Sequence, residues 1–239
     1  MIRSIYKMIK IEPFIIGENV NLCKPDKKFA ADSEWYNWFN DPVNTKYLDQ
    51  GEEINTPENQ LKFFLSIKNR FILIIQDKKS KKYLGTVSLS NINNKKKTCE
   101  LAIVRDLKLN KFSSPLSSLE SVSLITEYAF EKMGIRIISA GQHINLKKWQ
   151  NQMELAGYKL EGLHTDRFYK FGKEADSVSI ACNIKDYRHI KKIRKKFWDG
   201  NQKMFKRYKQ LIKIEKFLDK FVRFFDKERE NYYKKIFEL

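Results

Sequence analysis

Apolar and polar positions alternate between strand-like and helix-like spacing along most of the chain. Short apolar or alternating runs predict strands at 19–23, 71–76, 83–92, 98–104, 135–140, 158–160 and 177–184. Apolar residues three and four apart predict helices at 30–40, 56–68, 116–133 and 146–156. This order predicts an α/β (α+β) domain with a mixed, mostly antiparallel sheet that becomes parallel near the helix at 116–133.

The C-terminal region differs from the rest in pattern and in charge. From 202 to 239 helical spacing continues, with a broad apolar stripe that includes Leu211, Leu218 and Phe225. The chain has 47 Lys+Arg against 29 Asp+Glu, a net charge of +18, and residues 184–239 hold +11 of it. We therefore expect one domain over 1–184 and a basic amphipathic helical extension over 185–239.

Three kinds of partner are compatible with this extension. It could pack on its own domain or form a homo-oligomer through the C-terminal helices, which we favour because neither needs a different molecule. An anionic membrane surface is the second choice, because aromatic and basic residues alternate there. A nucleic acid is the third, because the charges suit phosphates but no RNA-binding module is recognisable.

Composition excludes several classes of protein. With 42% hydrophobic and 13% aromatic residues the chain is neither disordered nor fibrous. Cys23, Cys99 and Cys182 cannot all pair and lie at neither CxxC nor metal-ligand spacing, which favours a reducing cytoplasm and predicts no metal site. No apolar run is long enough to span a bilayer, so we expect a cytoplasmic protein, with a peripheral position at the inner face of the membrane as the alternative.

Several short motifs occur in an order that is familiar from one enzyme family. They are Trp35-Tyr-Asn-Trp-Phe-Asn-Asp-Pro42, Leu84-Gly-Thr-Val-Ser-Leu-Ser90, Cys99-Glu-Leu-Ala-Ile-Val104, Glu120 with Tyr128-Ala-Phe130, and Gly157-Tyr-Lys-Leu-Glu-Gly162. Over about residues 17–184 the chain resembles the GNAT acyltransferases. The nearest branch includes ribosomal-protein N-terminal acetylases and acetylases of nucleotide-linked amino sugars. The resemblance implies an N-acetyltransferase that uses acetyl-CoA.

The resemblance also implies where acetyl-CoA would bind. Its pantetheine arm would follow the strand containing Ile103 and Val104, and its pyrophosphate would lie at the start of the helix at 116–133. The family's glycine-containing phosphate loop is replaced here, since no Gly occurs from Leu101 to Met133. The residues expected to hold the cofactor are Ser113, Ser114, Ser117, Ser118, Asn145 and Trp149.

The family's reaction is direct attack of a neutral amine on the thioester, which requires a base and an acid. Glu100 is the first candidate base and His143 the alternative. Many relatives carry a Tyr that acts as the general acid, but the corresponding residue here is Met153. Water or Tyr158 therefore remains for the role of general acid. The substrate-binding candidates, from the first helices and the late hairpin, are Trp35, Trp38, Asn40, Tyr47 and His164.

Three functions are compatible with these residues. We favour acetylation of an amino-sugar nucleotide in bacterial surface-polysaccharide synthesis. The first alternative is a non-catalytic GNAT-fold binding or structural protein, for example in a ribonucleoprotein, because the glycines and the Tyr are missing. The second alternative is a protein N-terminal acetylase.

Overall fold

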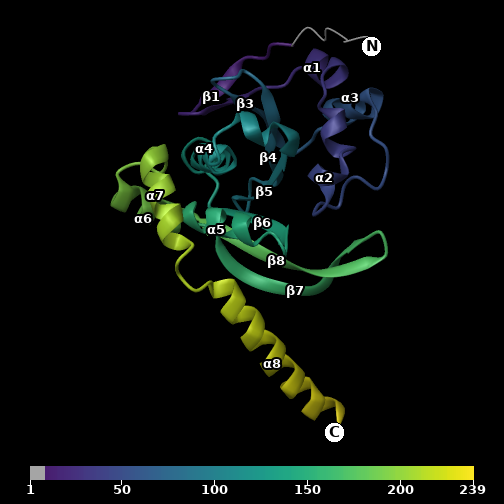
Figure 1. Ribbon diagram of the computed structural model, residues 1–239, viewed down its shortest axis with the longest axis vertical. Helices are drawn as coiled ribbons and strands as arrows, with labels where there is room; N and C mark the ends of the chain where they lie inside the picture. Colours follow the sequence, from purple (N-terminus) through teal and green to yellow (C-terminus); the bar gives the residue numbers. More distant parts are fainter. Residues whose placement is uncertain (1–8) are drawn as a thin grey trace.

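A computed structural model describes residues 9–239 and contains one eight-stranded sheet in the order β1-β2-β3-β4-β5-β6-β8-β7. Helices α4 and α5 lie on one side of the sheet and α1 to α3 on the other (Figure 1). The strands are β1 Pro13–Ile16, β2 Val20–Cys23, β3 Phe71–Asp77, β4 Tyr83–Asn93, β5 Thr98–Arg105, β6 Ile137–His143, β7 Lys159–Lys170 and β8 Lys173–Asn183. The α-helices are α1 Lys27–Asp32, α2 Pro42–Thr45, α3 Pro57–Leu65, α4 Ser117–Glu131, α5 Lys147–Leu155, α6 Ile184–Arg194, α7 Asn201–Leu211 and α8 Phe217–Phe237.

The parallel part of the sheet is confined to one short segment. All neighbouring strands pair antiparallel except β5 and β6, whose register runs only from Thr98 opposite Ile137 to Glu100 opposite Ser139. Beyond that point β5 continues to Arg105 and β6 to His143 without pairing to each other. The two strands therefore diverge into a V-shaped opening. The predicted mixed, mostly antiparallel sheet is confirmed.

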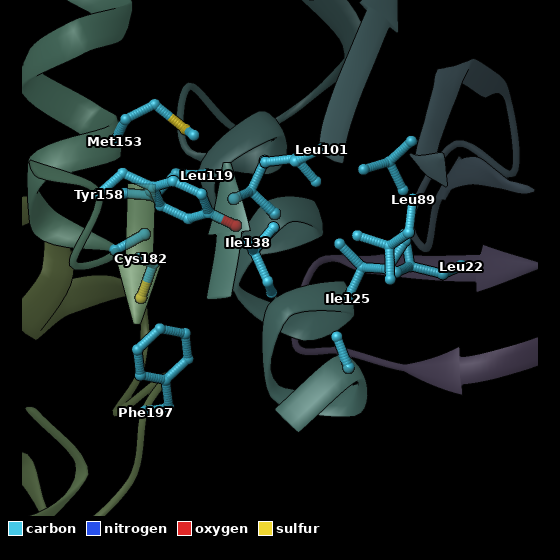
Figure 2. Close-up of a cluster of buried hydrophobic side chains, with 14 of the residues drawn as sticks. Leu22, Leu89, Leu101, Leu119, Ile125, Ile138, Met153, Tyr158, Cys182 and Phe197 are labelled. Atoms are coloured by element: carbon cyan, nitrogen blue, oxygen red, sulfur yellow. The ribbon is translucent and has the colours of Figure 1, made fainter. Parts of the chain in front are cut away.

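The main core fills the space between α4 and the sheet. Leu119 and Ile125 of α4 are fully buried in it, and Figure 2 shows them with apolar side chains of the neighbouring strands. Tyr158 belongs to the same core, and its hydroxyl lies 2.8 Å from the Thr126 hydroxyl. Burial raises the pKa of Tyr158 well above 10. This phenol therefore has a structural environment and not one suited to an acid catalyst.

A second core on the other side of the sheet corrects the helix expected at 30–40. The chain forms α1, which ends at Asp32 with Ser33 as its C-cap, and then a separate 3-10 helix, η1 Tyr36–Phe39. Trp35 and Trp38 are only 1% and 4% exposed, and the Trp35 ring packs on Phe29. Two bulky rings turned into the core at this break account for the change of helix type.

Other differences concern the long hairpin and the C-terminal helix. The strands expected at 158–160 and 177–184 are the roots of a much longer hairpin, β7 and β8. The helix expected over 202–239 is interrupted at 212–216 and forms α7 and α8. Within residues 9–239 no helix is both long and apolar enough to span a bilayer.

Most of the C-terminal region packs on the domain. Tyr187, Phe197 and Met204, from α6, α7 and their connection, are buried in the same core as α4. The start of α8 also packs, since Leu218 is buried against Leu163 and Val178 of the hairpin. The rest of α8 projects away from the domain (Figure 1). The boundary at residue 184 remains a prediction.

Two truncations test where the folded unit ends. Removing residues 226–239 should leave the melting temperature unchanged, because every side chain removed except that of Arg229 is exposed. Removing residues 184–239 should abolish cooperative folding. Loss of three buried side chains costs about 6–12 kcal/mol, comparable with the whole stability of a domain. Thermal unfolding followed by circular dichroism distinguishes the two; a stable fragment 1–183 would support the boundary at 184.

Candidate active site

A cavity of about 870 Å³ lies at the open end of the V, between the loop after β5 and the start of α5. It brings together five of the residues predicted to hold the cofactor, from two segments far apart in sequence. These are Ser113, Ser114, Ser118, Asn145 and Trp149. Arg105, Lys147, Lys148 and Gln152 are among the other lining residues. Cations and hydroxyl groups thus surround a space in front of a helix.

Arg105 is the organising side chain of this cavity. It is only 9% exposed, and its Nε donates to the Leu84 carbonyl at 3.1 Å. Its Nη1 and Nη2 donate to the Ser118 and Ser113 hydroxyls at 2.8 and 3.3 Å. Burial lowers the pKa of Arg105 to about 10, so the guanidinium keeps its charge at neutral pH. Within residues 9–239 no carboxylate forms an ion pair with it.

The start of α4 adds a second positive feature. The N-cap residue Leu116 has no side chain that can cap the helix, so first-turn N–H groups are left to other acceptors. The loop before it forms a 3-10 helix, η2 Leu107–Phe112, and no residue from 101 to 133 has a positive φ. This loop therefore does not require glycine for its conformation.

Not all predicted cofactor residues reach the cavity. Ser117 is fully buried in α4 and does not line it. Ile103 and Val104 are half-buried on the part of β5 that lies beyond the parallel pairing. Their backbone, and not their side chains, borders the V.

The two candidate bases lie on the face of the sheet opposite to the one that packs on α4 and the main core. Cys99 and Leu101 point into the main core, so Glu100 between them points away from it. Glu100 is exposed, and its carboxylate accepts a hydrogen bond of 2.8 Å from Asn91 Nδ2. It lies opposite Ser139, at the closed end of the V.

His143 lies at the open end, about 13 Å farther along β6 at four residues of extended strand. The residue is 6% exposed, and its ring packs between Tyr47 and Phe168, each with a centroid distance of 4.6 Å. Its Nδ1 accepts the Asn145 N–H at 3.0 Å, so the neutral ring carries its proton on Nε2. Burial, and then the charge of Lys46, lower the pKa of His143, which keeps it neutral at pH 7.

The predicted substrate residues are spread over several environments. Tyr47 contacts His143, as described, and His164 is exposed on the hairpin, with Nε2 3.1 Å from the Ser179 hydroxyl. Asn40 exchanges two hydrogen bonds with the Asn55 backbone, at 2.8 and 2.7 Å. Trp35 is buried in the second core and borders neither the cavity at the open end of the V nor the one beside Trp38. Trp38 is also buried but borders a surface cavity of about 410 Å³.

Lys170 joins the hairpin to the loop that carries Tyr47. This side chain is 6% exposed, and its ammonium donates to the carbonyls of Thr45 at 2.7 Å, Leu48 at 2.8 Å and Gln50. No motif in the sequence predicts a site role for Lys170, Phe168 or Arg105. For Lys170 no local signal exists, because its acceptors lie about 120 residues away in sequence.

No family model and no curated protein matches the sequence. Solved structures do match. A GCN5-related N-acetyltransferase from Brucella melitensis is 17% identical with a TM-score of 0.63, covering 81% of this chain and 86% of that one. Spermidine N-acetyltransferase from Vibrio cholerae, in complex with CoA and spermine, is 15% identical with a TM-score of 0.63, covering 71% and 98%.

The self-immunity acetyltransferase MccE of microcin C7, in complex with acetyl-CoA and AMP, is 20% identical with a TM-score of 0.59, covering 73% and 98%. At these identities the matches establish the fold. The chain has a GNAT-like fold.

Proposed function

We propose that the protein is an acetyl-CoA-dependent N-acetyltransferase that acts on a primary amine. The observation that carries the proposal is the cavity at the open end of the V. A buried guanidinium, three serine hydroxyls and the start of α4 converge there, and among the described residues no carboxylate forms an ion pair with Arg105. Two positive features that face the same space favour an anion between them, and the pyrophosphate of CoA is such an anion.

The rest of the opening suits an extended arm. The unpaired edge of β5 from Leu101 to Arg105 offers alternating N–H and C=O groups over about 16 Å. An amide-containing arm can hydrogen-bond along such an edge as an added strand does. Trp149 and Asn145 at the start of α5 would border its entrance.

Acetyl-CoA would supply the activated acyl group as a thioester. In the proposed reaction Glu100 accepts the proton from the incoming ammonium, because it is exposed at the end of the V farthest from the phosphate site. His143 is the weaker candidate base, because its Nε2 carries a proton and can donate but not accept. Met153 and Tyr158 are buried, which leaves water to protonate the departing thiolate.

The competing interpretation is a non-catalytic binding or structural protein. It would be supported by a V filled with side chains and a blocked start of α4. The cavity in front of Ser114 and Ser118, and the exposed Ala102 on β5, favour catalysis instead.

The acceptor amine is proposed on two separate grounds, the sequence resemblance and the charge of the loop that carries Tyr47. An amino-sugar nucleotide, and a protein N-terminus, remain predictions from the sequence resemblance. A cationic polyamine is favoured by a different observation: the loop with Tyr47 exposes Asp49, Glu52 and Glu53 against one cation, Lys46, and this net negative charge attracts a positively charged acceptor and repels a diphosphate.

Two measurements test the proposal. Calorimetry measures the binding of acetyl-CoA, and thiol release then measures turnover with amino-sugar nucleotides, polyamines and peptides as acceptors. We expect acetyl-CoA to bind and at least one amine class to release CoA. Absence of acetyl-CoA binding would contradict the proposed function, whatever the acceptor.

A further inference from the structure

The basic charge of the C-terminal region is concentrated in α6, α7 and their connections, and not in the long helix α8. Residues 184–216 contain 13 Lys and Arg against three Asp and Glu, a net charge of +10. Residues 217–239 contain six against five, a net of +1. More than half of the protein's charge of +18 is thus carried by 33 residues, on the side of the domain that carries α4 and α5 (Figure 1).

The cations of this segment divide into internal and external groups. Arg194 donates to the Leu155 carbonyl, and Arg207 pairs with Asp199 at 2.6 Å. Lys191 pairs with Glu127 and Glu131. The exposed cations that remain are almost all lysines: Lys185, Arg188, Lys192, Lys195, Lys196, Lys203, Lys206, Lys209 and Lys213.

Apolar side chains lie exposed among these lysines. Ile193 at the end of α6 is 67% exposed, and Ile212 and Ile214 after α7 are 51% and 62% exposed. On α7, Phe205 shares a helical stripe with Lys209 and Ile212, at intervals of four and three residues. The inward side of the same helix is anchored by the buried Met204. The outer side of α7 therefore combines lysines with the exposed Phe205, and the connection to α8 adds Ile212 and Ile214, which border a hollow beside the start of α8.

We propose that the outer side of α6 and α7 is a docking surface for an anionic lipid membrane. Lysines are attracted to a negatively charged headgroup layer, and exposed Ile and Phe side chains gain by entering its acyl boundary. A nucleic acid offers no comparable partner for three exposed isoleucines, and its recognition favours Arg, which this surface has largely turned inward.

Membrane contact is thus placed on α6 and α7 and not on the apolar stripe predicted over 202–239, most of which lies on α8. The projecting half of α8 has balanced charge, with four cations and four anions over residues 226–239. Its exposed Tyr232, Tyr233 and Phe237 are compatible with the predicted homo-oligomer instead. α8 thus provides an internal control for the charge on α7.

Two charge-reversal variants separate a specific surface from overall charge. One replaces Lys203, Lys206 and Lys209 of α7 by Glu; the other does the same to Lys227, Lys234 and Lys235 of α8. All six lysines are exposed, and each variant lowers the net charge from +18 to +12. Flotation of the full chain is measured with vesicles of phosphatidylcholine alone and with about 30% phosphatidylglycerol added.

We expect binding only to the anionic vesicles, weakening with added salt. The α7 variant should bind about 10²-fold more weakly and the α8 variant within about threefold of the wild type. Replacing Ile212 and Ile214 by Ser should lower the fraction that stays bound at high salt. If the α7 variant melts at a lower temperature, the same three lysines changed to Gln repeat the comparison.

Three results would overturn the proposal: no binding to anionic vesicles, equal loss in both variants, or tighter binding to a single-stranded RNA of about 20 nucleotides than to vesicles at the same salt. None of them bears on acetyl-CoA binding, so the docking surface and the proposed function fail independently.

Discussion

Replacing Arg105 by Gln is expected to lower the affinity for acetyl-CoA about 10- to 100-fold, the value of one or two charge-assisted hydrogen bonds. The guanidinium is the buried charge that faces the start of α4, and it also holds the Ser113 and Ser118 hydroxyls in place. Without it the cavity loses its fixed cation and the orientation of two donors. Calorimetric titration with acetyl-CoA measures the change.

The same substitution should lower the free energy of unfolding by about 1–3 kcal/mol, because the Leu84 carbonyl loses its charged donor and keeps only the Asp106 N–H at 2.9 Å. Arg194→Gln is the matched control. Arg194 is also buried enough that its pKa is lowered, and it donates to the Leu155 carbonyl at 2.9 Å, away from the cavity. The control should lose stability while keeping its affinity. Equal loss of affinity in both variants would mean that Arg105 acts only through stability.

Arg105→Lys adds a third comparison. It keeps the charge but loses the planar fork that spans two serines. We expect an affinity for acetyl-CoA between those of the wild type and the Gln variant. If the charge contributes more than the planar fork, the affinity should be closer to that of the wild type.

The sequence pattern was sufficient to predict the sheet, because strands and long helices can be recognised from the local spacing of their apolar residues. The helix at 116–133 and the strands at 71–76 and 98–104 are close to the observed α4, β3 and β5. The pattern also contained a signal for Arg105 that was missed. Since Cys99, Leu101 and Ile103 alternate inward, extending the strand by one residue places Arg105 on the inward face.

Other parts of the site depend on contacts between distant segments. Lys170 and the carbonyls it binds are about 120 residues apart, and no local spacing relates them. Phe168 packs against His143 only because the hairpin is long enough to reach it. The break of the helix at 30–40 likewise follows from two tryptophans that pack in a second core. Tertiary packing decided each of these features.

Replacing Glu100 by Gln is expected to lower turnover about 10²- to 10⁴-fold, the usual contribution of a general base. The amide keeps the size of the side chain but cannot accept the proton of the incoming ammonium. Affinity for acetyl-CoA should stay within about twofold, because Glu100 points away from the phosphate cavity, which it does not line. Steady-state thiol release with an acceptor found active, together with calorimetry, measures both quantities.

Glu161→Gln on β7 is the matched control, since it removes an exposed carboxylate of the same kind on the edge strand, three strands across the sheet from Glu100. It should leave both turnover and affinity unchanged. A second comparison uses chemical rescue: Glu100→Ala should recover part of its turnover when formate is added, because a small carboxylate can occupy the vacated space and accept the proton. A structural role for Glu100 would show no such recovery. If Glu100→Gln retains full turnover while His143→Gln loses it, the base is His143, and the imidazole must then exchange the Asn145 hydrogen bond for the opposite tautomer before it can accept a proton.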